Sequence, residues 1–404
     1  MTRPSFGLVR SGQRAGKRRF DVVFYTPSVG GRISSAVSRS GGGAETQVLM
    51  LAKELAALGA RVAIVAFGGP AELPYDVDGV SIVPRPHHGK RGGLIGSLVE
   101  TTQIWRSLWR APSGVVVARS AGPHLGVISV YARLARRRFV YSSASPVDFE
   151  PSRLLPLRRD LLIHKLGVRL ADAVVVQTEE QASACWAACE RAPVLIKSLS
   201  PLAEQRERTP SAFLWVGRMI SYKRPLEYLE LARAVPEATF WMVGVPRERM
   251  DGEEQVAEEV IARSTTLPNL KLLPHRPREE LVELMWHAVA SVNTSDFEGM
   301  PNVLLEAWSR GVPALVLTCD PGGVVIKHGL GAFANGSQER FAELARELWQ
   351  SRGDQDALSL RCRRYITDHH SPRKLARQWC DVLALSPVGH DLPPATEAQT
   401  RCAA

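Results

Sequence analysis

The chain has 404 residues, which is too long for one ordinary hydrophobic core, so we expect two domains of about 200 residues each. A hydrophobic fraction of 45% and a charged fraction of 23% are typical of a soluble globular protein, and no apolar run is long enough to cross a bilayer. The formal net charge is +10, and no apolar segment follows the basic N-terminus, which argues against a secretory signal.

The first half of the chain alternates short apolar segments with amphipathic ones, a pattern that predicts a parallel sheet covered by helices. Five strands are expected there: Phe20–Tyr25, Arg61–Ala66, Val115–Ala118, Arg138–Ser142 and Ala173–Gln177. A glycine- and serine-rich loop follows the first strand and leads into a helix over about residues 44–58, which Gly59 ends. We predict one doubly wound α/β domain over residues 1–205, with residues 1–19 flexible.

A polar stretch that ends in proline, Glu204–Pro210, is expected to link this domain to a second one. The alternation then resumes, and the expected strands are Ala212–Val216, Ala238–Val243, Leu270–Leu273, Ala290–Thr294 and Ala314–Leu317. We therefore predict a second doubly wound domain over residues 206–370. A helix is expected over residues 371–385, and the Pro-, Ala- and Thr-rich segment 386–404 is expected to be disordered.

The most informative stretch joins the fourth strand of the second domain to a helix and runs from Ser295 to Gly311. Pro301 and Asn302 suit the first positions of a helix, so Glu298 is expected just outside the N-terminus and Glu306 about one turn inside it. Free amides at a helix N-terminus attract phosphate, and carboxylates beside them can accept hydrogen bonds from sugar hydroxyls. The segment therefore indicates a nucleotide-sugar pocket.

Residues Glu298 to Ala307 read Glu-Gly-Met-Pro-Asn-Val-Leu-Leu-Glu-Ala and resemble the donor site of retaining GT-B glycosyltransferases, specifically the large family four. The family has two Glu separated by seven residues in this setting, usually with an aromatic residue where Met300 stands. The resemblance covers most of the chain. It implies two Rossmann-like domains that face each other across a cleft, and a C-terminal helix that crosses back to the first domain.

The resemblance also implies residue roles. The donor would lie in the second domain, with Glu298 on the sugar hydroxyls and Glu306 on the ribose hydroxyls. The other donor-binding residues that it implies are Gly217, Gly299, Met300, Pro301, Asn302 and Val303.

A second motif, Gly217-Arg218 followed by Lys223, comes after the first strand of the second domain. It resembles the family's Gly-Arg … Lys motif, whose cations hold the donor diphosphate. Two fixed cations opposite a helix N-terminus would neutralise the charge that grows on the leaving diphosphate. The turn after a strand is also where open sheets bind ligands. We expect Arg218, Lys223 and Glu298 to act in catalysis.

The segment Ser40–Glu45, in the loop after the first strand, resembles the family's Gly-Gly-Ala-Glu loop at the interdomain cleft. Gly42 and Gly43 let backbone amides approach a phosphate or sugar closely, and Glu45 completes the motif. A dinucleotide-binding dehydrogenase carries its Gly-x-Gly-x-x-Gly turn directly after the strand, and that fingerprint is absent. A flexible glycine loop without a ligand is the alternative.

One family feature is missing. Many members carry a His after a mid-domain strand, where it helps to position the donor sugar, and residues 140–148 contain none. Asp148 and His124 are candidates to replace it, although a structural role is the ordinary expectation for each.

Positive charge is concentrated in the first half of the chain. Residues 1–200 contain 27 Lys and Arg against 14 Asp and Glu, whereas the remainder contains 24 against 27. A basic half fits an anionic partner such as membrane lipid, a polyprenyl-phosphate carrier or an acidic glycan, and nucleic acid fits on charge alone. The predicted helix over residues 157–171, with Arg158, Lys165 and Arg169 beside leucines, suits a membrane interface, and an ordinary solvated surface is the alternative.

No metal site is expected, because the ten His lack ligand spacing and the six Cys contain no Cys-x-x-Cys pair, which favours free thiols. We predict a retaining hexosyltransferase that needs no cofactor or metal. It would move a sugar from a UDP-sugar, or from GDP-mannose, to a glycan or lipid-linked saccharide in cell-envelope or exopolysaccharide synthesis. The expected location is the cytoplasm, with peripheral contact to the anionic inner face of the membrane and no nucleic acid partner.

Two alternatives stay open. A GT-B epimerase or phosphorylase would use the same donor, and a non-catalytic basic module would bind anionic lipid or nucleic acid.

Overall fold

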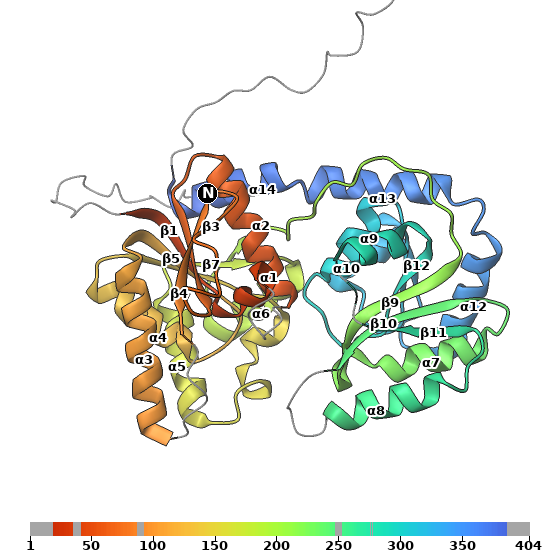
Figure 1. The fold of residues 1–404 in the computed structure, drawn as a ribbon, viewed down its shortest axis with the longest axis horizontal. Helices are drawn as coiled ribbons and strands as arrows, with labels where there is room; N and C mark the ends of the chain where they lie inside the picture. Colours follow the sequence, from red (N-terminus) through yellow and green to blue (C-terminus); the bar gives the residue numbers. More distant parts are fainter. Residues whose placement is uncertain are drawn as a thin grey trace, which may run out of the picture.

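The computed structural model describes residues 19–34, 42–86, 93–246, 253–274, 276 and 278–385. Figure 1 shows two α/β domains side by side, joined by an extended segment and by the last helices of the chain. The segments predicted to be flexible or disordered, 1–19 and 386–404, lie outside the described residues except for residue 19.

An eight-stranded sheet lies at the centre of the first domain, with strand order β3-β4-β2-β1-β5-β6-β7-β8. Its strands are β1 (Phe20–Tyr25), β2 (Val62–Phe67), β3 (Asp76–Val77), β4 (Val80–Arg85), β5 (Ser113–Arg119), β6 (Arg138–Ser142), β7 (Ala173–Val176) and β8 (Val194–Leu195). Only the β3–β4 pair is antiparallel. The strand order reverses between β1 and β5, and ligands of open parallel sheets bind at the carboxyl ends of strands at such a point.

Helices cover both faces of this sheet, which explains why its strands are continuous apolar runs rather than alternating ones. The helices are α1 (Gly30–Ile33), α2 (Gly43–Ala57), α3 (Gly93–Arg110), α4 (His124–Leu134), α5 (Arg158–Leu170) and α6 (Glu179–Cys189). Val22 and Phe24 of β1 pack with α2, whereas Val23 and Tyr25 pack with residues of α3, α4, α5 and α6 on the opposite face.

The second domain has a six-stranded parallel sheet with order β11-β10-β9-β12-β13-β14. Its strands are β9 (Ala212–Met219), β10 (Phe240–Pro246), β11 (Leu270–Leu273), β12 (Ala288–Asn293), β13 (Ala314–Val316) and β14 (Gly331–Phe333). Its helices are α7 (Pro225–Ala234), α8 (Glu253–Ser264), α9 (Arg278–Trp286), α10 (Asn302–Ser309), α11 (Val324–His328), α12 (Gln338–Gln350) and α13 (Asp356–His369). The order reverses between β9 and β12, so the segments after these two strands meet.

The last helix, α14 (Pro372–Leu383), returns to the first domain and packs against α2 (Figure 1). Its Leu375, Trp379 and Leu383 are buried in the same apolar cluster as Val22 and Phe24 of β1. The crossing helix and the two parallel sheets confirm the predicted GT-B fold.

All ten predicted strands and the predicted helices over residues 44–58, 157–171 and 371–385 are present, with shifts of up to three residues at their ends. Three short strands, β3, β8 and β14, and the six-residue strand β4 were not predicted. The predicted start of β10 at Ala238 is wrong because the Ala238 amide donates to Val235 O in a turn, and the strand begins at Phe240.

Candidate active site

The segment that follows β12 is hydrogen-bonded to the segment that follows β9. Thr294 is fully buried, and its hydroxyl donates to Lys223 O over 2.7 Å and accepts from Trp215 Nε1 over 3.0 Å. The Asp296 amide donates to Tyr222 O over 2.9 Å. These bonds hold the loop with Lys223 beside the loop with Glu298, at the point where the strand order reverses.

Glu298 and Lys223 form an ion pair between these loops. The Ser295 hydroxyl donates to the same carboxylate oxygen, Glu298 Oε1, over 2.8 Å. Both charged side chains are largely buried, so water screens their attraction weakly. They line a cavity of about 330 Å³, including its opening, together with Pro301 and Val303.

Helix α10 begins beside this cavity. Asn302 is its first helical residue, as predicted, whereas Pro301, also predicted at the first positions of the helix, is its extended N-cap with φ −65° and ψ 123°. Glu306 lies one turn inside and accepts from Arg278 Nη2 over 2.7 Å. Arg278, the first residue of α9, was not predicted as a site residue. The sequence feature that could have suggested it is its position shortly after β11, at the carboxyl edge of the sheet.

Arg218 lies at the end of β9 and takes no part in the ion pair. It is exposed, and its Nη2 donates to the Tyr222 hydroxyl over 3.2 Å. The Tyr222 ring stacks on Phe297, with ring centroids 4.7 Å apart. Lys223 lines the cavity, whereas Arg218 is not among its lining residues.

Three other predicted donor residues have structural contacts. The side chain of Met300 packs against the apolar cluster of α10 and α13, and Gly217 faces the Trp215 ring, 3.0 Å from where a Cβ would lie. Gly299 is buried against the first domain: a Cβ there would lie 2.3 Å from Ala144 O and 3.0 Å from Gln181 Nε2.

The predicted loop of the first domain meets the start of α10. The Glu45 carboxylate accepts from the Gly42 amide over 2.7 Å at the start of α2, and Gly43 O accepts from Asn302 Nδ2 over 2.9 Å. Gln47, which was not predicted, donates through Nε2 to Asn302 Oδ1 and to Leu199 O, each over 2.8 Å. Gly43 thus contacts the start of α10 in the second domain, while Gly42 and Glu45 are bonded to each other at the start of α2.

The two candidates for the missing family His are both held by structural contacts. Asp148 is buried and accepts from the Tyr141 hydroxyl over 3.1 Å and from the Ala144 amide over 2.7 Å, and burial raises the pKa of its carboxyl. His124 lies against the Tyr25 ring, and burial lowers the pKa of its imidazole to about 4.

Within the described part of the chain, no group of three or more His, Cys, Asp or Glu is arranged to hold a metal ion. Two Asp-x-Asp triplets, Asp76–Asp78 and Asp354–Asp356, lie outside the site, in the β3–β4 turn and at the start of α13. No helix among the described residues has the length and apolar character needed to cross a bilayer.

Two sheets that each reverse their strand order and a last helix that crosses back to the first domain define the GT-B fold. Family models agree: residues 42–194 match the glycosyl transferase 4-like domain, and residues 202–367 match glycosyl transferases group 1. The chain belongs to the group 1 glycosyltransferases, which transfer a sugar from a nucleotide-sugar donor.

Solved structures share this fold. A sucrose-phosphate synthase from Thermosynechococcus elongatus is 15% identical with a TM-score of 0.71, over 91% of this chain and 98% of that one. Anabaena HepE in complex with UDP-glucose is 17% identical with a TM-score of 0.67, over 90% and 99%. A glycosyltransferase from Rickettsia africae is 14% identical with a TM-score of 0.65, over 91% and 98%. These likenesses show the fold.

Proposed function

We propose that this enzyme transfers a hexose from a UDP-sugar, with GDP-mannose as the second candidate donor, and retains the anomeric configuration. The observation that carries the proposal is the Lys223–Glu298 pair in a cavity at the start of α10. The cation and the free amides of the helix suit a diphosphate, and the carboxylate suits sugar hydroxyls. The complex of Anabaena HepE with UDP-glucose supports UDP as the nucleotide of the donor.

Each carboxylate expected to bind the donor is paired with a cation in the structure. Glu298 is paired with Lys223, and Glu306 with Arg278. In our proposal, the diphosphate takes Lys223 from Glu298, which frees that carboxylate for the sugar hydroxyls. The exposed Arg218 also binds the diphosphate, and Glu306 keeps Arg278 while it accepts from the ribose. Gly299, Met300 and Asn302 contribute backbone amides, beside Gly217, Pro301 and Val303.

The proposed reaction uses no side-chain nucleophile. The bond from the anomeric carbon to the diphosphate oxygen breaks, and the acceptor oxygen bonds to the same face of that carbon. The acceptor proton passes to the leaving phosphate. Lys223 and Arg218 stabilise the charge that collects there, so catalysis rests on charge stabilisation and on closure of the two domains, taken as residues 1–205 and 206–370. This scheme requires no metal.

The donor is tested by calorimetric titration of UDP, GDP, ADP and dTDP into the protein. We expect micromolar affinity for one of them, UDP first, and at least a tenfold loss in Glu306→Ala. Asp381→Ala, an exposed carboxylate on α14, is the matched control. Failure of every nucleotide to bind the folded protein would refute the proposal.

We also propose that the acceptor is a saccharide or lipid-linked saccharide presented at an anionic membrane surface. Helices α3, α4 and α5 lie side by side on one face of the first domain (Figure 1). Exposed large apolar side chains on them are Ile95, Leu98, Trp109, Val130, Leu134, Leu162 and Leu166. Exposed basic side chains on the same helices are Arg106, Arg110, Arg133, Arg158, Arg159, Lys165 and Arg169. Apolar groups beside cations suit a bilayer with anionic headgroups.

Sedimentation with vesicles tests this face. We expect binding to vesicles that contain phosphatidylglycerol, little binding to phosphatidylcholine alone, and loss of binding in Leu98→Glu/Leu162→Glu. Ile261→Glu, at an exposed position of α8 in the second domain, is the control. Equal sedimentation with both lipids, or an unaffected double variant, would contradict the proposal.

A further inference from the structure

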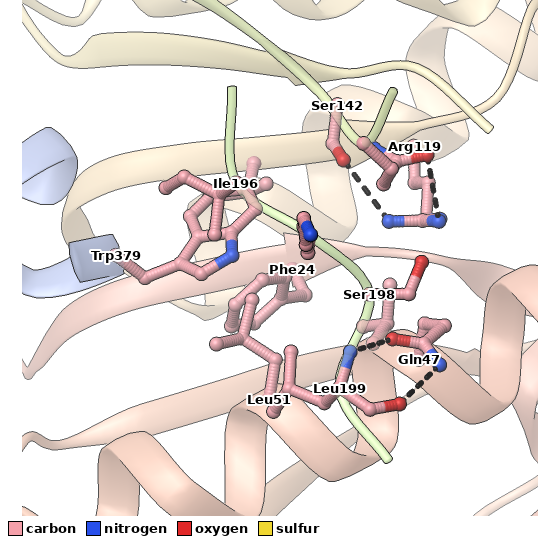
Figure 2. Close-up of a pocket in the computed structure, with 13 residues that line it drawn as sticks. Phe24, Gln47, Leu51, Arg119, Ser142, Ile196, Ser198, Leu199 and Trp379 are labelled. Carbon is pink, nitrogen blue, oxygen red and sulfur yellow. Dashed lines mark hydrogen bonds between the residues drawn. The ribbon is translucent and has the colours of Figure 1, made fainter. Parts of the chain in front are cut away.

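The carboxyl edge of the first domain's sheet carries a cation without an ion-pair partner (Figure 2). Arg119 is the last residue of β5, beside β1, where the strand order reverses. Its guanidinium donates to Ser142 Oγ over 3.1 Å and to Gln177 Oε1 over 3.4 Å, which are both neutral, and its Nε has no partner. Among the described residues, no carboxylate lies within 4.0 Å of this guanidinium.

The nearest carboxylates already have other hydrogen-bond donors. Asp148 accepts from Tyr141 and Ala144, and Glu45 accepts from the Gly42 amide. Burial lowers the pKa of Arg119 to about 10, and the charges of Asp148 and Glu45 offset only part of that effect. The guanidinium thus keeps its charge at neutral pH in a poorly solvated place, where an uncompensated charge is costly.

Two neighbouring side chains also end in buried polar atoms without partners. Thr26, which follows β1, leaves Oγ1 unpaired, and Gln177, which follows β7, leaves Nε2 unpaired. Both residues are more than nine-tenths buried. With Arg119 Nε, the edge therefore offers three hydrogen-bond donors, so its complement is a group rich in acceptors.

These atoms lie where the two domains join. The cavity beside Arg119 is lined by Gln47 of α2, which contacts Asn302 of the second domain, and by residues 196–199, which follow β8 (Figure 2). In this closed arrangement the free space holds about one water molecule. Arg119 as a whole residue is of intermediate exposure, whereas its Nε atom is buried.

We propose that this edge binds a negatively charged group of the sugar acceptor, a phosphate or a carboxylate, through Arg119 Nε and Gln177 Nε2. The proposal rests on the proposed function, because it assigns the acceptor side of the same cleft. It names the acceptor class as anionic saccharides or phosphate-bearing carriers. A single ordered water is the other possible partner of these atoms.

Calorimetry on the UDP-saturated protein tests the proposal, with glucose, glucose 6-phosphate, glucuronate and a polyprenyl phosphate in detergent micelles as probes. We expect at least one anion to bind ten or more times tighter than glucose, and the panel distinguishes a soluble phosphate, a carboxylate and a lipid phosphate. Arg119→Gln should lose at least tenfold in that affinity, and Arg119→Lys should lose less. Arg364→Gln, at an exposed position of α13, should bind as the wild type does.

Gln177→Glu keeps the test decisive if Arg119→Gln folds poorly. The new carboxylate would pair with Arg119, so we expect a higher thermal midpoint together with the loss of anion binding. Unchanged anion affinity in Arg119→Gln or Gln177→Glu, or anions that bind no tighter than glucose, would overturn the proposal. Arg119 would then have a structural role, with a water molecule as its hydrogen-bond partner. Absence of UDP binding would instead count against the donor site.

Discussion

Gly299 provides a direct test of whether catalysis requires the closed cleft. Its backbone lies outside the left-handed region, so alanine is compatible with the local conformation of the second domain. The added Cβ, however, would lie 2.3 Å from Ala144 O of the first domain, whereas ordinary contact begins at 3.4 Å. Gly299→Ala must therefore hold the two loops apart by about 1 Å, and a displacement of that size in a reacting site lowers turnover by about 100-fold.

The assay measures UDP release from UDP-glucose with and without acceptor, alongside the affinity for UDP. We expect turnover to fall by about 100-fold, while the affinity for UDP, whose proposed site lies in the second domain, changes by less than about threefold. Gly353→Ala is the matched control, because a Cβ there meets no atom within 4 Å. Wild-type turnover in Gly299→Ala would refute the reasoning that closure brings these loops together for catalysis.

Three further predictions concern the active site, the core and the pH dependence. Glu298→Gln should lower turnover by about 10²–10³-fold, because the carboxylate that binds the sugar is lost. UDP should bind as well as before or better, because Lys223 no longer pairs with Glu298. A parallel loss of UDP affinity would contradict the proposal that Lys223 moves from Glu298 to the diphosphate. Trp308→Ala should lower the free energy of unfolding in urea by about 3–5 kcal/mol, because Trp308 is fully buried and its Nε1 donates to Leu330 O over 3.1 Å; a loss no larger than that of Trp308→Phe would be inconsistent. Burial lowers the pKa of His370 to about 3. Its contribution to the free energy of unfolding is therefore fully present above the unfolded pKa of about 6.5 and falls by up to about 1.4 kcal/mol per pH unit as the pH drops below that value. His370→Gln should weaken the pH dependence of stability between pH 7 and 5, and an equal dependence in the variant would reject this assignment.

The long apolar strands could be predicted because both faces of each sheet are covered, so periodicity and burial agree. β1, β6 and β11 were predicted with the correct ends. The β3–β4 pair was missed because β3 has two residues and Pro84 interrupts the apolar run of β4. A signal was nevertheless present: Asp78 and Gly79 have φ of 52° and 81°, and Asp-Gly is the preferred pair for a tight hairpin turn.

Residues of the candidate active site could be predicted where a short motif contains them. The positions of Glu298, Pro301 and Asn302 around the start of α10 follow from the local sequence. The contacts of Gln47 with Asn302, of Gly299 with Ala144 and of Arg278 with Glu306 join residues that are far apart in the chain. Such pairs depend on how the two domains and their loops pack, which no local spacing reveals.

The packing of α14 has a consequence for synthesis of the protein on the ribosome. Strands β1 to β8 are translated first, but Leu375, Trp379 and Leu383 complete the apolar layer between their sheet and α2. Until those residues emerge, the nascent first domain exposes that layer, while the second domain has its whole sheet available. Folding of the two domains is therefore expected to finish in the reverse of their order in the chain, and shielding of the α2 face by a chaperone is most needed late in translation.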